Sequence, residues 1–291
     1  MENAGTVNLE KNDVKMPSVS NPSNKPAVKS STKMKEAFLY GFLGLSAVIT
    51  VGFLLWLIAY VIIKGMGHID ISGLIAPIVT TIYMVGIGLG ISVPIGIGTA
   101  IYLNEYSNGG KFVQGIRFAT ECLAAVPSIL FGLFGMMFFV RMLGFSWSIL
   151  SGGLTISIMI LPTVVKTTEE ALKTVPQSYR EGSLALGASK FATIRKVVLP
   201  SATPGILTGV VFSTGRIIGE TAAIYLTAGT VFQIPQSVMS SGRTLSVHLY
   251  MLAKEGISFE QAYGAAIVLL AVVLALNFLS YFIASRIGKT K

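Results

Sequence analysis

The chain has 291 residues, of which 52% are hydrophobic and only 12% are charged. A soluble domain of this length needs about twice that share of charged side chains to cover its surface, so an ordinary soluble protein is excluded and lipid is the expected solvent. The net charge of +9 does not indicate nucleic-acid binding, because the basic residues gather in the tails and one long loop, as membrane orientation requires. Cys122 is a single cysteine in an apolar run, so neither an intrachain disulfide nor a thiolate metal cluster is expected.

Residues 1–34 are rich in Asn, Ser, Pro and Lys and have no apolar period. Such a segment cannot bury enough surface to offset its chain entropy, so it is predicted to be a disordered cytoplasmic tail. The first apolar run begins far from Met1 and is long, which argues against a cleaved signal peptide. Residues 35–291 are predicted to form one transmembrane domain.

Six apolar segments follow one another along this domain. They cover residues 37–63, 71–104, 115–140, 145–165, 204–229 and 263–284. The first would reach about 40 Å as a helix, more than the roughly 30 Å hydrocarbon core of a bilayer. The sequence therefore predicts an all-α integral membrane protein with six transmembrane helices, a polar loop at 166–203 and a moderately polar loop at 230–262.

The distribution of Lys and Arg predicts the orientation. Six crossings place both termini on one side of the membrane, and four basic residues, Lys64, Arg141, Arg243 and Lys254, fall on the other. The side with the termini has fifteen within the segments near the membrane: Lys25, Lys29, Lys33, Lys35, Lys111, Arg117, Lys166, Lys173, Arg180, Lys190, Arg195, Lys196, Arg286, Lys289 and Lys291. By the positive-inside rule, both termini are predicted to be cytoplasmic.

The cytoplasmic loop 166–203 is too short for a separate domain and is predicted to form two or three short helices with a turn at Gly187. Its apolar residues suit either a partner surface or packing against the bundle of this chain, and composition does not separate the two. These residues are Leu184, Leu186, Ala188, Phe191, Ile194, Val197 and Val198, and Arg180, Lys190, Arg195 and Lys196 are expected to form a basic rim around them.

The order Glu181, Gly187, Val197 and then Leu199-Pro200 resembles the EAA loop of ABC importer permeases, although Gly182-Ser183 replace the usual Ala-Ala. The segments AVPSILFGLFG (125–135), GRIIGETAA (215–223) and SGRTLSVHLYMLAKEG (241–256) are similar to phosphate importer permeases, most of all their PstA-type subunit. The resemblance covers about residues 40–285. It implies a type I, MetI-like permease fold in which Glu181, Gly187, Ala188, Leu199 and Pro200 belong to a loop that couples to an ATPase subunit.

Two charges lie within the fifth apolar segment. Arg216 is 12 residues after Pro204, about 18 Å along a helix and so near the middle of a bilayer. Glu220 is four residues further on, which would place both side chains on one helix face. The pair could be a self-neutralised structural contact or an anion relay; the relay is favoured because intramembrane charges are usually functional and a guanidinium matches phosphate oxygens. The resemblance supports this reading, since phosphate permeases have Arg and Glu at the matching place.

The remaining polar candidates have weaker support. Arg117 and Glu121 repeat the same spacing, but Arg117 lies close enough to the segment end for its side chain to reach the cytoplasmic headgroups. Thr221, Ser128 and Thr227 could donate hydrogen bonds to a passing anion or serve helix packing. For Arg243 and His248, a solvated outer loop is the expected setting, with docking of an external binding protein as the alternative.

No Walker A loop is found, because Gly288-Lys289-Thr290 has Ile283 where the first glycine should be. ATP is therefore expected to bind to other subunits, with no cofactor or metal on this chain. The resemblance implies two ATPase subunits, a second homologous permease and an extracytoplasmic phosphate-binding protein, in a cytoplasmic membrane importer for phosphate. Residue chemistry does not separate phosphate from another oxyanion (sulfate, molybdate or phosphonate). An anion channel would leave the apolar face of the cytoplasmic loop unexplained. An intramembrane enzyme would need a nucleophile or paired acids, for which Arg216 and Glu220 are a poor match.

Overall fold

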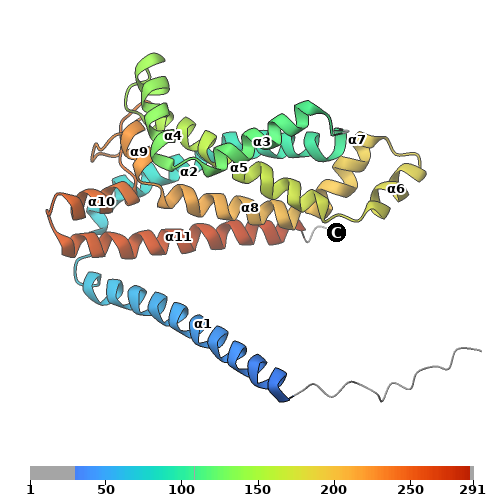
Figure 1. The fold of residues 1–291 in the computed structure, drawn as a ribbon. Coiled ribbons are helices and arrows are strands. Elements are labelled where there is room, and N and C mark those ends of the chain that lie inside the picture. The colour runs from blue at the N-terminus through green and yellow to red at the C-terminus, as the bar shows by residue number, and fades with distance from the viewer. Residues whose placement is uncertain (1–29, 108, 289–291) are drawn as a thin grey trace, which may run out of the picture. The chain divides into compact units, whose positions relative to one another are not determined.

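The computed structural model describes residues 30–107 and 109–288, and every regular element within them is a helix (Figure 1). The predicted tail, residues 1–34, lies largely outside this range, although its last residues already belong to the first helix. The chain divides into two units, Met1–Trp56 and Leu57–Lys291, and each is described by itself.

The helices follow the chain in this order: α1 (Ser30–Gly65), α2 (Ile71–Ile101), α3 (Lys111–Ala125), α4 (Ser128–Gly135), α5 (Ile149–Lys173), α6 (Gln177–Ala185), α7 (Lys190–Thr193), α8 (Leu199–Gly219), α9 (Ala222–Thr227), α10 (Leu245–Lys254) and α11 (Phe259–Gly288). Three π-helical turns adjoin them: η1 (Tyr102–Tyr106), η2 (Met136–Met142) and η3 (Ile194–Val198). Helix α2 continues into η1, and η3 joins α7 to α8. Two continuous helical stretches are therefore longer than α2 or α8 alone.

Five helical stretches among the described residues are long and apolar enough to cross a membrane. They are Phe38–Gly65, Ile71–Tyr106, Ile149–Lys173, Lys190–Gly219 and Phe259–Phe282. A sixth crossing results if α3 together with α4 and η2 is counted as one broken span. The predicted all-helical membrane fold is thereby confirmed. Its third segment, however, is a bent pair of helices and not the single helix that the sequence predicted.

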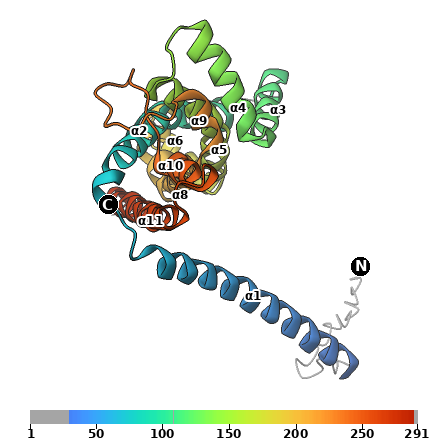
Figure 2. The same cartoon turned by 90° about the vertical axis from the view of Figure 1, so that its left-hand side faces the viewer.

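That third segment is bent by 101° between α3 and α4. Pro127 lies at the bend; it has no backbone N–H to donate and disfavours helical geometry in the residue before it, so Val126 is extended (φ −68°, ψ 129°). The continuous helix predicted across residues 115–140 is therefore wrong. In Figure 2, α3 and α4 lie on the side of the bundle away from α11.

Helix α5 is the centre of the Leu57–Lys291 unit and packs against α2 and α8. Glycines allow the close approach: a Cβ atom at Gly96 of α2 would lie 2.6 Å from a methyl group of Val164, and one at Gly153 of α5 would lie 2.5 Å from Ile87. Small residues of this kind are typical of tightly packed transmembrane helices. The dense glycines of the second segment thus serve helix packing, as the sequence indicated.

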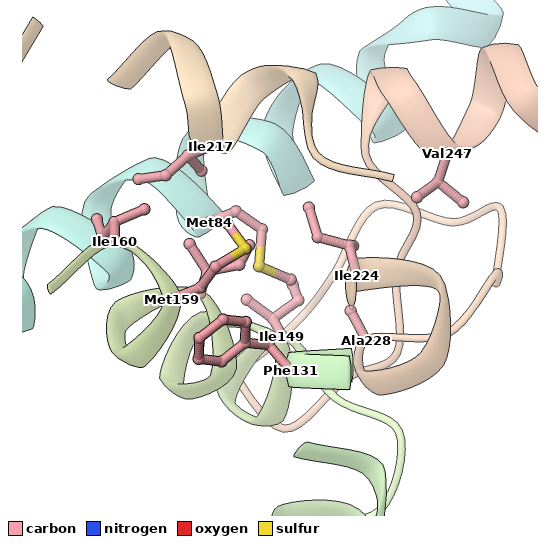
Figure 3. Close-up of a cluster of buried hydrophobic side chains, with 10 residues drawn as sticks. Met84, Phe131, Ile149, Met159, Ile160, Ile217, Ile224, Ala228 and Val247 are labelled. Carbon is pink, nitrogen blue, oxygen red and sulfur yellow. The ribbon is translucent and has the colours of Figure 1, made fainter. Parts of the chain in front are cut away.

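The main buried cluster joins six helices near the end of the bundle that carries α9 and α10. Figure 3 shows Met84 of α2 between Met159 and Ile149 of α5, with Phe131 of α4 and Ile224 of α9 around them. Several of these side chains have no solvent-accessible surface. This cluster fixes α8 and α9, and therefore the polar residues at the break between them, against α5.

Three predicted boundaries differ from the structure. Helix α5 continues to Lys173, so the first eight residues of the predicted loop 166–203 are helical and Glu169 is buried. The loop's other end, from Lys190, belongs to the continuous helical stretch that contains α8. The predicted fifth helix, 204–229, is broken at Glu220, where the backbone is extended.

Candidate functional site

Arg216 and Glu220 do not form the pair that their spacing predicts. The i to i+4 argument holds only within a continuous helix, and α8 ends at Gly219, with Glu220 extended (φ −71°, ψ 130°). Glu220 turns away to cap α9, its Oε1 accepting a hydrogen bond from the backbone N–H of Ala223 (3.1 Å). The predicted self-neutralised pair is therefore wrong, and Arg216 lacks the counter-ion expected for it.

Arg216 lies in the last turn of α8, where its Nη1 donates a hydrogen bond to Oγ1 of Thr163 on α5 (3.3 Å). No described carboxylate forms an ion pair with it. The guanidinium lines an open cavity of about 610 Å³ between α8 and α11, bounded by Thr208, Val211, Phe212, Gly215 and Asn277. A half-buried cation without a counter-ion is a site that favours an anion.

The break between α8 and α9 gathers polar groups next to Arg216. Thr221 begins the turn into α9 and is half-buried. The backbone carbonyl of Glu220 accepts a hydrogen bond from Ser246 of α10 (2.6 Å), and Thr227 bonds back to the carbonyl of Ala223 (2.6 Å). Thr227 therefore serves helix packing, the second of the two roles predicted for it. Glu220 and Thr221 lie at the end of α8 that contains Arg216.

Glu121 lies elsewhere, in a cavity of about 590 Å³ between α3 and α5. In its wall, Arg117 Nη2 and Lys173 Nζ each lie 2.8 Å from Oε1 of Glu169. Arg117 therefore has a specific partner on α5, and the prediction that contact with headgroups suffices to explain it is wrong. Three acidic and three basic side chains line this cavity (Glu121, Glu169, Glu170, Arg117, Lys166, Lys173), and two of the three cations already pair with Glu169.

Ser128 is the first residue of α4, just after the bend at Pro127, and is half-buried. The predicted substrate-pathway residues thus occupy separate places in this chain. Arg216, Glu220 and Thr221 lie together at the end of α8, Glu121 lies in the α3–α5 cavity, and Ser128 lies at the α3–α4 bend.

The predicted coupling loop forms a helical hairpin, defined here as residues 177–193, at the end of the bundle opposite α10 (Figure 1). Gly187 has a φ of +83°, a left-handed conformation that suits glycine, so the predicted turn is confirmed. Ser189 then caps α7 by accepting from the N–H of Ala192 (3.2 Å). Glu181 is exposed on α6 and Ala188 is half-buried after the turn, while Leu199-Pro200 are the first residues of α8.

Arg180 attaches this hairpin to η1, the turn that follows α2. Its Nη2 lies 2.7 Å from Oε1 of Glu105 in η1, and its Nε lies 3.2 Å from both oxygens of that carboxylate. Nη1 and Nη2 also donate to the carbonyls of Val175 (2.7 Å) and Leu172 (2.9 Å). Because this side chain is only 14% exposed, the prediction that it belongs to an outer basic rim is wrong.

The apolar residues of the loop divide between the two settings that composition left open. Ile194 and Val198 are buried against the bundle of this chain. Leu184, Leu186 and Phe191 are exposed, Leu186 to 91%. A cluster of exposed apolar side chains on a firmly attached hairpin is typical of a surface that another protein covers.

At the opposite end, Arg243 lies in the predicted loop but is half-buried, and His248 is in a helix instead of a solvated loop. Residues 245–254 form α10, and His248 is 7% exposed, with its ring stacked on Phe232 (centroids 5.0 Å apart, planes 5° apart). The guanidinium carbon of Arg243 lies 4.0 Å from the centroid of the same ring. Burial and the neighbouring Arg243 lower the pKa of His248 from 6.5 to about 4, so the imidazole is neutral at pH 7.

Sequence reasoning missed Glu105, Thr163, Glu169 and Asn277. The partners of Glu105 and Thr163 are remote in sequence, so no spacing rule signals these two residues. Glu169 could have been found, because Lys173 lies four residues after it on the same helix. No group of three or more His, Cys, Asp or Glu side chains within the described residues is placed to hold a metal ion.

The described residues thus combine helices long and apolar enough to cross a membrane, a cation in the last turn of one of them, and an exposed apolar hairpin at one end. The model of the family "Binding-protein-dependent transport system inner membrane component" matches residues 92–290. The chain belongs to this family. It is a multi-pass membrane protein, and the predicted importer-permease class is confirmed.

Curated relatives agree with the family match. The chain is 30% identical over 286 residues to a probable ABC transporter permease protein, YqgI, of Bacillus subtilis, covering 88% of this chain and 97% of the relative. It is 34% identical over 212 residues to the phosphate transport system permease protein PstA 1 of Mycobacterium tuberculosis (71% and 69% covered). It is 30% identical over 260 residues to the corresponding PstA of Haemophilus influenzae (84% and 92% covered).

Solved structures share the fold at low sequence identity. A bacterial alginate ABC transporter in complex with its alginate-bound periplasmic protein contains a chain that matches with a TM-score of 0.69 at 16% identity, covering 89% of this chain and 98% of that one. A chain of the inward-facing MetNI methionine ABC transporter matches with a TM-score of 0.55 at 19% identity, covering 74% and 94%. The MetI-like architecture is thereby confirmed.

Proposed function

We propose that this chain is a transmembrane subunit of an ATP-driven importer that moves inorganic phosphate across the cytoplasmic membrane. The names of the relatives from Mycobacterium tuberculosis and Haemophilus influenzae support phosphate as the substrate. Within the chain, the observation that carries the proposal is Arg216, which lies in the last turn of a candidate membrane span, lines a cavity, and has no carboxylate partner among the described side chains. An anion passing this point would gain charge-assisted hydrogen bonds that the empty site lacks.

In this proposal, the hairpin 177–193 transmits the free energy of ATP hydrolysis to the permease. Leu184, Leu186 and Phe191 would fill a hydrophobic cleft of an ATPase subunit, which would shield them from water. Exposed Glu181 and the turn at Gly187 and Ala188 lie on the same hairpin, as the EAA-like motif requires. ATP binds to the partner subunits, so this chain transports and has no ATPase site of its own.

The complete transporter would contain two ATPase subunits, a second homologous permease, and a phosphate-binding protein on the outside. Both termini of this chain would be cytoplasmic, which places the hairpin inside and α10 outside. The second permease would complete the pathway, since Arg216 and Glu121 lie in separate cavities of a single chain.

Arg216→Gln tests the anion pathway. The variant keeps a polar side chain that can bond to Thr163 but removes the charge, so phosphate uptake by the assembled transporter should fall by at least about 100-fold. Arg141→Gln, which removes an exposed arginine at the opposite end of the bundle from the hairpin, is the matched control and should leave uptake unchanged. Uptake of sulfate and molybdate, measured in parallel, decides between phosphate and the other oxyanions. Normal phosphate uptake by Arg216→Gln would refute the role of this residue.

Crosslinking tests the partner. With Cys122 replaced by serine, a cysteine introduced at half-buried Ala188 should crosslink to a cysteine in the ATPase cleft, because Leu186, two residues away, is 91% exposed. The same scan should be repeated at each position from 181 to 196. If no position in this range yields a crosslink, the hairpin is not the ATPase contact.

A further inference from the structure

A cavity of about 230 Å³ lies at the end of the bundle that carries α10, opposite the hairpin (Figure 1). It lies where the beginnings of α2 and α11 meet α10. Its polar lining consists of His68, Asp70, Arg243, His248 and Gln261, and its apolar lining includes Phe232. None of these residues belongs to the Arg216 cavity or to the coupling hairpin.

Two groups in this cavity are buried without partners. Nε of Arg243 and Nδ1 of His248 are both inaccessible to solvent and have no hydrogen-bond partner, and His248 as a whole is more than nine-tenths buried. Buried polar atoms are nearly always bonded, so two orphans from adjacent side chains indicate a missing ligand. Phe232 holds both side chains in place, with its ring contacting the guanidinium and stacking on the imidazole.

Three acidic residues lie near this cavity: Asp70 in its lining, Glu260, and Glu255, whose charge opposes the lowering of the Arg243 pKa by burial. The carboxylate of Asp70 accepts hydrogen bonds from Ser72 (2.5 Å) and from the N–H of Gly73 (3.1 Å), which cap α2 and lower the pKa of Asp70. Glu260 lies 3.4 Å from His68. Among the described side chains, no carboxylate forms an ion pair with Arg243, and burial lowers the pKa of its guanidinium.

We propose that this cavity is a binding site for a small oxyanion, with Arg243 as its cationic donor and His248 as a neutral polar contact. The guanidinium fork matches two oxygens of a tetrahedral anion, and the apolar wall formed by Phe232 strengthens the attraction by excluding water. The proposal rests on the proposed function: the α10 end faces outward, and the anion is the phosphate that is then passed toward Arg216. The site is an additional stage of the pathway, separate from the Arg216 cavity.

The experiment uses a single cysteine as a reporter at the rim. Gln261, which is exposed and lines the cavity, is replaced by cysteine in the Cys122→Ser background of the complete transporter. A membrane-impermeant, negatively charged methanethiosulfonate is added from outside, and the rate of labelling is measured against phosphate concentration at constant ionic strength. A cysteine at Ser237, an exposed loop position that does not line the cavity, is the control for general effects of phosphate on the reagent.

Phosphate should slow labelling at position 261 in a saturable way and leave position 237 unaffected. Arg243→Gln should raise the phosphate concentration for half-protection by about tenfold or more, because a charge-assisted contact is lost. Two control variants are used. Lys254→Gln removes one positive charge from α10 at a residue outside the cavity lining, and Arg216→Gln changes the Arg216 cavity. In both, phosphate should still slow labelling at position 261.

Two results would overturn the proposal. One is labelling that phosphate does not slow, or slows equally in Arg243→Gln. The other is protection by the binding protein but not by phosphate, which would make the cavity a protein-docking contact instead. Failure of the proposed function is distinguishable, because it would appear as no labelling of position 261 from outside or as phosphate uptake that does not depend on Arg216.

Discussion

Replacing Arg180 by methionine removes the charge that attaches the hairpin 177–193 to η1 while keeping most of the apolar side-chain volume. The variant leaves the carboxylate of Glu105, whose side chain is only 7% exposed, with a single described side-chain donor, Nδ2 of Asn104 (2.8 Å). The carbonyls of Val175 and Leu172 each lose a guanidinium donor, and that of Leu172 keeps the backbone N–H of Val175 (3.3 Å). The substitution therefore removes several hydrogen bonds, all of them where the hairpin is attached to the bundle.

Removing one partner of a buried ion pair costs about 3–5 kcal/mol, because the remaining charge is left uncompensated. We expect the lower limit of this cost, about 3 kcal/mol, because Asn104 still donates a hydrogen bond to Glu105 and this end of the bundle lies near water. Glu105→Gln in the same background should recover part of this loss, since it removes the orphaned charge. A double-mutant cycle should give a coupling of at least about 2 kcal/mol between the two side chains.

Hydrogen exchange of the purified protein, read on peptides from α6, is the direct assay. An opening that becomes easier by about 3 kcal/mol should raise exchange in α6 by roughly 100-fold. Peptides from the core of α5 should change far less, because the hairpin detaches without unfolding the bundle. Arg195→Met, at an exposed arginine in η3, is the control. Exchange in α6 within about threefold of the parent protein would refute the structural role assigned to Arg180.

Three further predictions concern packing, pH and the α3–α5 contact. Gly96→Ala should cost about 1–3 kcal/mol in thermal unfolding, because its Cβ would meet Val164, while Gly98→Ala, with no atom within 4 Å of the new Cβ, should be neutral or slightly stabilising. The pKa of His248 is lower in the folded than in the unfolded state, so protonation opposes folding. Stability should fall by at most about 3 kcal/mol as pH drops from 6.5 to 4, and His248→Gln should lose that dependence. Glu169→Gln should lower the midpoint of thermal unfolding by several degrees, because its two cationic partners lose a shared carboxylate; an unchanged midpoint would contradict this.

The membrane-crossing segments could be predicted, apart from several of their boundaries, because the cost of exposing charge to lipid acts on each segment by itself. The turn at Gly187 was also predictable, since glycine there is a local conformational signal. These features depend on residues close together in the sequence. Local physics therefore accounts for the architecture and for the position of the hairpin.

The errors at the site have two causes: an assumption of helical continuity, and partners that are remote in sequence. Arg216 and Glu220 would share a face only if α8 continued past Gly219, and the break is imposed by packing of α9 in the core and by the contact of Ser246 with the Glu220 carbonyl. Arg180 looked like a surface residue because its partner, Glu105, is 75 residues away. Interactions of this kind are set by tertiary structure, so no periodicity in the sequence reveals them.

The helical stretch from Lys190 to Gly219 connects the two functional ends of the chain in a single element. At 1.5 Å per residue its 30 residues measure about 45 Å. In the proposed importer this stretch would move as a rigid element. Its inner end begins in the hairpin that would contact the ATPase, and Arg216 is near its outer end. A tilt of only about 5° would displace one end relative to the other by about 4 Å, enough to bring the guanidinium into or out of reach of an anion. Transmission of force from nucleotide to substrate would then need no chain of side-chain rearrangements.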